Sequence, residues 1–295
     1  MADRIEHIGV VGSGLMGSGI TEVCARAGMD VIVVEADVAA AERGRERLER
    51  SLQTGARRGK LTEDDVETAL ANVSYATDLG ELADRELVVE AITEDAAAKL
   101  AVFKTLDEVV ASEHAILASN TSSIPIMKLA TVTRRPEQVL GLHFFNPVPV
   151  LKLVELVTSL MTSDVVVDRS TAFVTGPLGK RVIRSQDRAG FVVNSLLIPY
   201  LLSAVRMLES GFATRDDIDA GMVEGCAHPM GPLALSDLIG LDTMQAVAES
   251  LYEEFKEPLY APPPLLLRMV EAGLMGRKSG RGFYEYGRET ARATA

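Results

Sequence analysis

A histidine and a glutamate stand in two neighbouring apolar runs. His143 lies in the run GLHFFNP, and Glu155 follows twelve residues later in KLVELV. Both runs are typical of buried strands, where a carboxylate without a partner would be costly. Pairing with the imidazole relieves that cost, fixes the tautomer of the ring and favours its protonated form. The pair therefore predicts a general base, His143, which removes a hydroxyl proton as hydride leaves, with Glu155 as its partner.

The other histidines and the two cysteines show no pattern that indicates a catalytic or metal-binding role. We expect surface positions for His7 and His114, next to predicted strands, and a structural role for His228 in a loop between helices. Cys24 and Cys226 lie in small and apolar surroundings, without CxxC or Cys/His spacing. We therefore expect buried free thiols and no metal site.

A glycine-rich loop near the N-terminus matches the pattern G-x-G-x-x-G. It follows a strand-like run and opens a helical one, which is the context in which this pattern binds a dinucleotide. The first glycine permits a tight turn, the second lets the backbone approach a pyrophosphate, and the third lets helix and strand pack closely. The positive N-terminus of the helix then holds the pyrophosphate. The loop residues are Gly12, Ser13, Gly14, Leu15, Met16 and Gly17.

An acidic residue at the end of the next predicted strand indicates which dinucleotide binds. Glu35 follows Gly17 by 18 residues, close to the spacing of about 20 expected for the ligand of the ribose 2′-hydroxyl. Its carboxylate would accept hydrogen bonds from the ribose and repel the 2′-phosphate of NADP. Neither Ala36 nor Asp37 offers a compensating positive charge. The sequence therefore predicts NAD rather than NADP.

The elements that position these residues alternate between strands and helices. Strands are expected near residues 5–11, 31–37, 86–92, 115–123, 138–147 and 152–157. Alternation of this kind is typical of a Rossmann-like doubly wound α/β sheet with right-handed crossovers. A charged insertion at 38–72, interrupted by glycines, predicts a helical hairpin that forms an arm on this domain.

From about residue 187 the sequence changes to helical segments separated by glycine and proline, with a short strand expected only at 282–286. We therefore expect an NAD-binding domain at 1–187 and an all-helical domain at 188–295. The apolar stretch 191–208 includes Pro199 and several polar residues, so it predicts a core or interface helix and not a membrane span. Its apolar surface predicts a homodimer. The active site is expected in the cleft between the domains, at the carboxyl ends of the strands.

The net charge of the chain limits the kinds of partner that it can bind. The 295 residues carry a formal net charge of −12. Nucleic acids and anionic membranes bind positive protein surfaces, so neither is an expected partner. The first residues lack the basic and apolar regions of a signal peptide, which favours the cytoplasm. An anionic substrate would need a local basic patch on this acidic protein.

Five sequence blocks resemble the L-3-hydroxyacyl-CoA dehydrogenase family, and most closely its stand-alone short-chain members. In chain order they are SNTSS at 119–123, GLHFFNPVPVLKLVELV at 141–157, GFVVN at 190–194, HPMGPLALSDLIGLDT at 228–243 and KSGRGFYEY at 278–286. The resemblance covers nearly the whole chain. It implies hydride transfer between NAD and C3 of a short (S)-3-hydroxyacyl-CoA, with 3-hydroxybutyryl-CoA and acetoacetyl-CoA as the pair, in fatty-acid metabolism. The residues indicate neither the preferred length of the acyl chain nor whether the cell uses the oxidation or the reduction.

The resemblance also implies roles for individual residues. His143 would be the base and Glu155 its orienting partner, while Ser122 and Asn194 would bind the substrate oxygens. Contacts with NAD are implied for Glu94, Lys99, Ser122 and Lys278.

Contacts with CoA are implied for Ser51 and Arg58 in the helical hairpin. The arginines around them would form the basic patch that an acyl-CoA needs, although glutamates are interleaved with them. Relatives commonly carry Lys in place of Arg58 and Asp in place of Glu35. These two departures leave the geometry of both contacts open.

Two other functions compete with this one. The chain could act on a free hydroxy or sugar acid within the same superfamily, but the basic hairpin and the SNTSS segment favour a CoA ester. It could also bind NAD without catalysis, because a fold does not fix a function. The presence of His143, Glu155, Ser122 and Asn194 together favours an enzyme.

Overall fold

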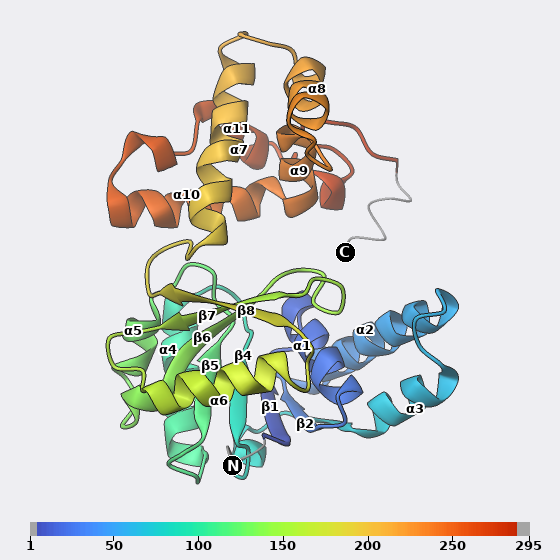
Figure 1. Ribbon diagram of the computed structural model, residues 1–295, viewed down its shortest axis with the longest axis vertical. Coiled ribbons are helices and arrows are strands. Elements are labelled where there is room, and N and C mark those ends of the chain that lie inside the picture. Colours follow the sequence, from blue (N-terminus) through green and yellow to red (C-terminus); the bar gives the residue numbers. More distant parts are fainter. Residues whose placement is uncertain (1–4, 288–295) are drawn as a thin grey trace. The chain divides into compact units, whose positions relative to one another are not determined.

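The computed structural model describes residues 5–287. These residues belong to two compact units, Met1–Arg188 and Ala189–Ala295. The boundary expected at residue 187 lies one residue before the observed one. The first unit is a sheet flanked by helices, and the second is built from helices (Figure 1). Within residues 5–287, no helix has the length and apolar character needed to cross a lipid bilayer.

Eight strands form one sheet in the order β3-β2-β1-β4-β5-β6-β7-β8. Neighbouring strands run parallel except for β6 and β7, which are antiparallel. The strand order reverses at β1, and such a switch point is where doubly wound sheets bind their ligands. The strands are β1 (His7–Val11), β2 (Asp30–Val34), β3 (Val73–Ala76), β4 (Leu87–Glu90), β5 (Ile116–Ser119), β6 (Val139–Phe144), β7 (Leu153–Thr158) and β8 (Arg181–Gln186).

Four α-helices of the first unit begin where a side chain caps the first turn. Asp37 caps α2, Thr62 caps α3, Asp95 caps α4 and Ser163 caps α6, and each cap satisfies an amide that has no partner within its helix. The helices are α1 (Leu15–Arg26), α2 (Val38–Arg57), α3 (Glu63–Ala71), η1 (Leu79–Leu82), α4 (Ala96–Val109), α5 (Ile126–Ala130), η2 (Pro136–Gln138) and α6 (Asp164–Thr175). The expected hairpin at 38–72 is confirmed: α2 and α3 extend away from the sheet (Figure 1).

The second unit packs its helices around a core of its own. Its elements are α7 (Val193–Glu209), α8 (Arg215–Cys226), α9 (Pro232–Ile239), α10 (Leu241–Phe255), η3 (Pro258–Tyr260), α11 (Pro264–Glu271) and η4 (Arg277–Ser279). The C-terminal segment is tied to α9 by Asp237, which accepts the amides of Phe283 and Tyr284 at 2.9 Å and the hydroxyl of Tyr286 at 3.0 Å. Burial raises the pKa of Asp237 above its ordinary value despite these hydrogen bonds.

Several local predictions differ from the structure. The strand expected at 282–286 is wrong, because this part of the chain forms only the isolated bridges Gly276–Arg281 and Arg281–Glu285. Cys24 is buried as expected, but Cys226 is exposed, because it ends a helix with few buried residues. The strands β3 and β8 and the helix α6 were not predicted.

An ion-pair cluster around a buried carboxylate ties α4 to the segment that precedes η2. Asp107 is 4% exposed and accepts hydrogen bonds from Nε of Arg134 at 2.8 Å and from Nε of Arg135 at 3.0 Å. Burial raises the pKa of Asp107, but the hydrogen bonds and charges of both arginines outweigh it, so the pKa lies below the ordinary 3.8. The cluster therefore stabilises the fold above about pH 3.8, and this contribution is lost as the pH falls through the lower folded pKa.

We expect Asp107→Asn to lower the free energy of unfolding by roughly 1–3 kcal/mol at neutral pH, because the arginines lose their buried acceptor. Thermal unfolding of both proteins across a pH series measures the effect. The difference between them should shrink as the solution becomes acidic, because protonation removes the same charge from the parent. A constant difference would show that the charge of Asp107 is not its source.

Candidate active site

The predicted histidine–glutamate pair lies across two antiparallel strands. His143 of β6 is directly opposite Glu155 of β7, so both side chains point to the same face of the sheet. Nδ1 of His143 is 2.7 Å from Oε2 of Glu155. Glu155 is fully buried and His143 is 7% exposed. An ionised carboxylate at this distance holds the proton on Nδ1, which makes Nε2 the basic nitrogen of the neutral ring.

Neighbouring groups fix the position of the imidazole. The ring of Phe145 lies against it, with the two centroids 4.6 Å apart. The end of β6 is held by Asn120, whose Oδ1 accepts the amide of Phe144 at 2.9 Å. Asn120 follows β5, so this hydrogen bond joins the end of β6, which bears His143, to the segment that leads to Ser122. These contacts hold the imidazole in one orientation.

A buried lysine holds the loop that joins β6 to β7. The loop contains the cis peptide bond Asn146–Pro147. Nζ of Lys180 donates to the carbonyl of Val148 at 2.6 Å and to that of Leu151 at 2.7 Å. Burial lowers the pKa of Lys180 below its ordinary value. Sequence reasoning missed both Asn120 and Lys180, because no local pattern shows which distant backbone group a polar side chain reaches.

The glycine-rich loop connects β1 to α1 and has the geometry that a pyrophosphate requires. Gly12 has a φ of +91°, and a Cβ there would lie 2.9 Å from the carbonyl oxygen of Ala91. A Cβ on Gly17 would lie 1.9 Å from the carbonyl oxygen of Gly12, whereas nothing lies within 4 Å of a Cβ on Gly14. No side chain caps the N-terminus of α1. The first-turn amides and the open space above Gly14 therefore fit a bound dinucleotide phosphate.

Glu35 lies beside this loop, as the sequence predicted. Its carboxylate accepts the amide and the hydroxyl of Ser13, the latter at 2.8 Å. Arg47 of α2 donates to the carbonyl of Ser13 at 2.7 Å, so the hairpin also contacts the loop. A carboxylate at this position can accept hydrogen bonds from ribose hydroxyls and repels an additional phosphate.

A buried group of charges connects β4 with α4. Glu90, the last residue of β4, is fully buried, and Lys99 of α4 is 1% exposed. Nζ of Lys99 lies 2.5 Å from Oε1 of Glu90 and 3.3 Å from Oε2 of Glu94. The ammonium predicted to contact NAD therefore lies between two carboxylates. Sequence reasoning missed Glu90, although an acidic residue in the apolar run LVVEAI is the same signal that identified Glu155.

Glu94 connects this group to the loop that bears Ser122. Its Oε1 accepts the amides of Ser122 and Ser123 at 3.0 and 3.1 Å and the hydroxyls of Thr121 and Ser123 at 2.5 and 2.8 Å. Burial raises the pKa of Glu94, but the charge of Lys99 and these hydrogen bonds bring it below its ordinary value. Glu94 is therefore a carboxylate at neutral pH. The structure brings Glu94, Lys99 and Ser122 together, and their contacts with NAD and substrate stay predictions.

The remaining predicted residues lie in the hairpin and in the second unit. Ser51 on α2 and Arg58 at its C-terminal end are both exposed. Asn194 is the second residue of α7, and Nζ of Lys278 in η4 lies 2.5 Å from the carboxylate of Asp242. The roles of these four residues in binding stay predictions.

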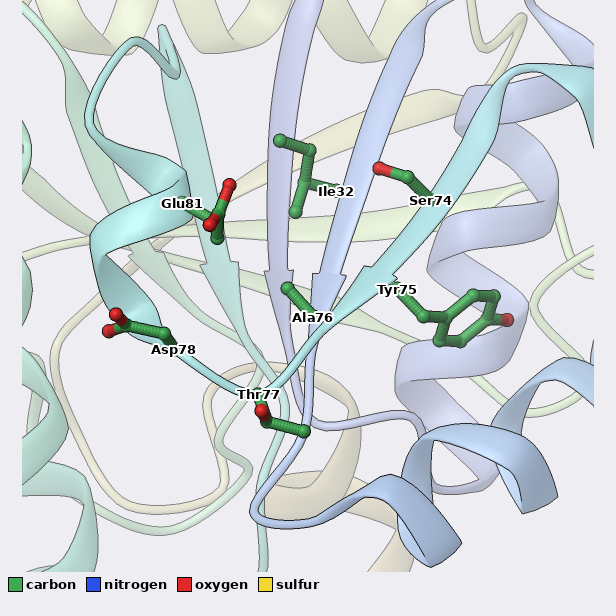
Figure 2. A pocket seen from close by; sticks show the side chains of 7 residues that line it. All are labelled: Ile32, Ser74, Tyr75, Ala76, Thr77, Asp78 and Glu81. Atoms are coloured by element: carbon green, nitrogen blue, oxygen red, sulfur yellow. The ribbon is translucent and has the colours of Figure 1, made fainter.

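A hollow of about 410 Å³ opens beside β2, β3 and η1. Figure 2 shows the side chains that line it, which include two carboxylates and three hydroxyls. They are Ile32, Ser74, Tyr75, Ala76, Thr77, Asp78 and Glu81. No predicted site residue is among them, so we do not assign the substrate to this hollow.

The doubly wound sheet with its glycine loop is typical of an NAD-binding domain, and the histidine–glutamate pair is a candidate for the base that a dehydrogenase needs. Comparison with known families agrees. Residues 7–188 match the 3-hydroxyacyl-CoA dehydrogenase NAD binding domain, and residues 190–286 match the C-terminal domain of the same enzymes. The chain therefore belongs to the 3-hydroxyacyl-CoA dehydrogenase family. The predicted fold class, enzyme class and cofactor are confirmed.

Individual relatives match along almost the whole chain. The 3-hydroxybutyryl-CoA dehydrogenase of Mycobacterium tuberculosis is 58% identical over 286 residues, which cover 97% of this chain and 100% of that protein. The crystal structure of M. tuberculosis FadB2 matches with a TM-score of 0.96 and 57% identity, covering 97% of this chain and 100% of that one. The (S)-3-hydroxybutyryl-CoA dehydrogenase PaaH1 of Ralstonia eutropha matches with a TM-score of 0.92 and 46% identity over the same shares.

Proposed function

We propose that the chain transfers hydride between NAD and C3 of a short-chain (S)-3-hydroxyacyl-CoA, with 3-hydroxybutyryl-CoA and acetoacetyl-CoA as the reacting pair. The observation that carries this proposal is the 2.7 Å contact between Nδ1 of His143 and Oε2 of Glu155. The pair lies on β6 and β7, which belong to the same sheet as β1, the strand that the glycine loop follows. The short acyl chain is supported by the names of the similar M. tuberculosis and R. eutropha enzymes.

In the proposed mechanism His143 accepts the proton of the substrate 3-hydroxyl at Nε2. Glu155 stabilises the imidazolium that results, because the two groups are paired in a buried site. When bound, NAD supplies the nicotinamide ring that accepts the hydride. The C3–H bond and the O–H bond break, and the C3=O double bond forms. Ser122 and Asn194 would donate hydrogen bonds to the 3-oxygen and to the acyl carbonyl.

The residues that would hold the cofactor surround the glycine loop. The amides of the loop and of the first turn of α1 would bind the pyrophosphate, and Glu35 would accept the ribose hydroxyls. Glu94 and Lys278 would make further contacts. Lys99 would act mainly through Glu94, because its ammonium is already paired with the carboxylates of Glu90 and Glu94.

The hairpin would provide the positive groups for CoA through Ser51 and Arg58. In a chain of net charge −12, phosphates need a local concentration of cations. Glutamates offset part of this charge within α2, because Arg45 lies 3.7 Å from Glu42. Arg58 has the exposure needed to meet an anionic ligand.

We also propose that the chain forms a homodimer and works in the cytoplasm. Leu196 and Met207 of α7 are 72% and 39% exposed, and Val192, the residue before this helix, is 39% exposed. These apolar side chains are candidates for burial against a second copy. Light scattering of the purified chain would measure the molar mass in solution and so test whether two copies associate. Both cysteines are free thiols, which fits a reducing compartment.

The test compares initial rates with 3-hydroxybutyryl-CoA and with free 3-hydroxybutyrate, each with NAD and with NADP. We expect rapid NADH formation only from the CoA ester with NAD, and falling kcat/KM as the acyl chain is lengthened to C8 and C16. A higher rate with the free acid would make the chain a hydroxy-acid dehydrogenase. No turnover at micromolar protein, with NAD still bound, would leave it a non-catalytic NAD-binding protein.

A further inference from the structure

Glu90 makes no contact with substrate in the proposed mechanism, yet its carboxylate is bonded on both oxygens. Oε1 accepts the amide of Ile92 at 2.7 Å and Nζ of Lys99 at 2.5 Å, and Oε2 accepts the hydroxyl of Ser119 at 2.7 Å. Glu90, Lys99 and Ser119 are each no more than 1% exposed. The donors come from the loop after β4, from α4 and from the end of β5, so one carboxylate joins three segments.

Stability alone does not account for this ion pair. Removing a carboxylate and an ammonium from water costs several kcal/mol each, and a hydrophobic pair of similar volume often stabilises a fold equally well. The contacts that the ion pair makes with neighbouring residues indicate its role better than its contribution to stability does. Lys99 also lies 3.3 Å from Glu94, so Glu90 and Glu94 share one ammonium.

The two carboxylates hold the loop after β5 from two sides. Glu94 accepts the amides of Ser122 and Ser123. On the other side, the hydroxyl of Ser119 donates to Glu90 and accepts the amide of Thr121 at 3.2 Å. Because Lys99 is fixed by Glu90, the position of Glu94 depends on Glu90 as well.

We propose that Glu90 is a positioning residue, which fixes the loop 119–123 through Ser119 directly and through Lys99 and Glu94 indirectly. It thereby sets the place of Ser122. The inference rests on the proposed function only for the role of Ser122 toward substrate, and its first test is independent of that function.

The test measures amide hydrogen exchange of the segment 119–124 in the full chain without substrate. Glu90→Gln keeps the shape of the side chain and removes its charge, so Lys99 loses its fully buried partner and keeps only the exposed Glu94 as a counter-charge. Exchange in this segment should accelerate about tenfold, because local opening becomes easier. Ser119→Ala is a milder second variant, which removes only one hydroxyl, and should accelerate exchange in the same segment by a smaller factor.

Asp107→Asn is the matched control. Asp107 lies on the same helix as Lys99 and is also a buried carboxylate paired with a cation. This control should lower the unfolding temperature while leaving exchange at 119–124 and kcat/KM unchanged. Glu90→Gln should also lower kcat/KM for the acyl-CoA by about 10–100-fold, as partners of functional groups commonly do.

Unchanged exchange at 119–124 in both Glu90→Gln and Ser119→Ala would overturn the inference. So would equal acceleration in Asp107→Asn, because the effect would then follow from stability alone. Accelerated exchange in a chain with no activity on any acyl-CoA would instead contradict the proposed function and leave the positioning role in place.

Discussion

Replacing His143 with alanine is expected to lower kcat by about 10²–10⁴-fold, the usual size of a general-base contribution. The variant has no group that takes the hydroxyl proton at the position of Nε2. The glycine loop and Glu35 are separate contacts, so the Kd for NAD should stay within about twofold of the parent. NADH formation from 3-hydroxybutyryl-CoA gives kcat, and calorimetric titration with NAD gives Kd.

His114 provides the control for this experiment. It is an exposed histidine in the loop before β5, so His114→Ala should change neither quantity. A His143→Ala chain with near-parental kcat would remove the basis of the mechanism. A chain that loses turnover together with NAD affinity would show that the substitution disturbs the cofactor site, and the base would have to be sought elsewhere.

The histidine–glutamate pair could be predicted from sequence because a charged side chain in an apolar strand must find a partner. The prediction needed only the residue types and two strands of sufficient length. The register in which the two strands pair cannot be read from the sequence. The antiparallel pairing of β6 and β7 sets His143 opposite Glu155, and a shift by one residue would have turned Glu155 to the other face of the sheet.

The residues that sequence reasoning missed divide into two kinds. Glu90 carried the same signal as Glu155, an acidic residue in an apolar strand, and could have been found. No sequence pattern identifies Asn120 or Lys180, because each binds backbone groups that only the folded chain brings near. Asn120 reaches a residue 24 positions away, and Lys180 reaches one 32 positions away.

The two strands that were missed are short or poorly buried. β3 has four residues. β8, with the sequence RVIRSQ, has no buried residue and forms the edge of the sheet, so its sequence resembles a polar connection. The segment 282–286 has aromatic residues typical of a strand, but it takes part only in an isolated bridge within its own unit. Its amides bind Asp237 instead, and such tertiary contacts override local propensity.

Glu155→Gln is expected to lower kcat by about 10–10³-fold, because the imidazolium that forms on His143 loses the buried counter-charge beside it. The amide oxygen of glutamine can still accept the proton on Nδ1, so the orientation of His143 is preserved and only the charge is lost. Steady-state kinetics with 3-hydroxybutyryl-CoA measures the effect. Glu137→Gln, at an exposed position of the same unit, is the control and should behave as the parent.

The double variant distinguishes a partner of the base from an independent contributor. If Glu155 acts only by stabilising the protonated form of His143, Glu155→Gln has nothing left to remove once His143 is alanine. The double variant should then have the kcat of His143→Ala, so the two losses should not add. Additive losses would mean that the buried carboxylate also acts on the substrate or the cofactor by a route that does not pass through the imidazole.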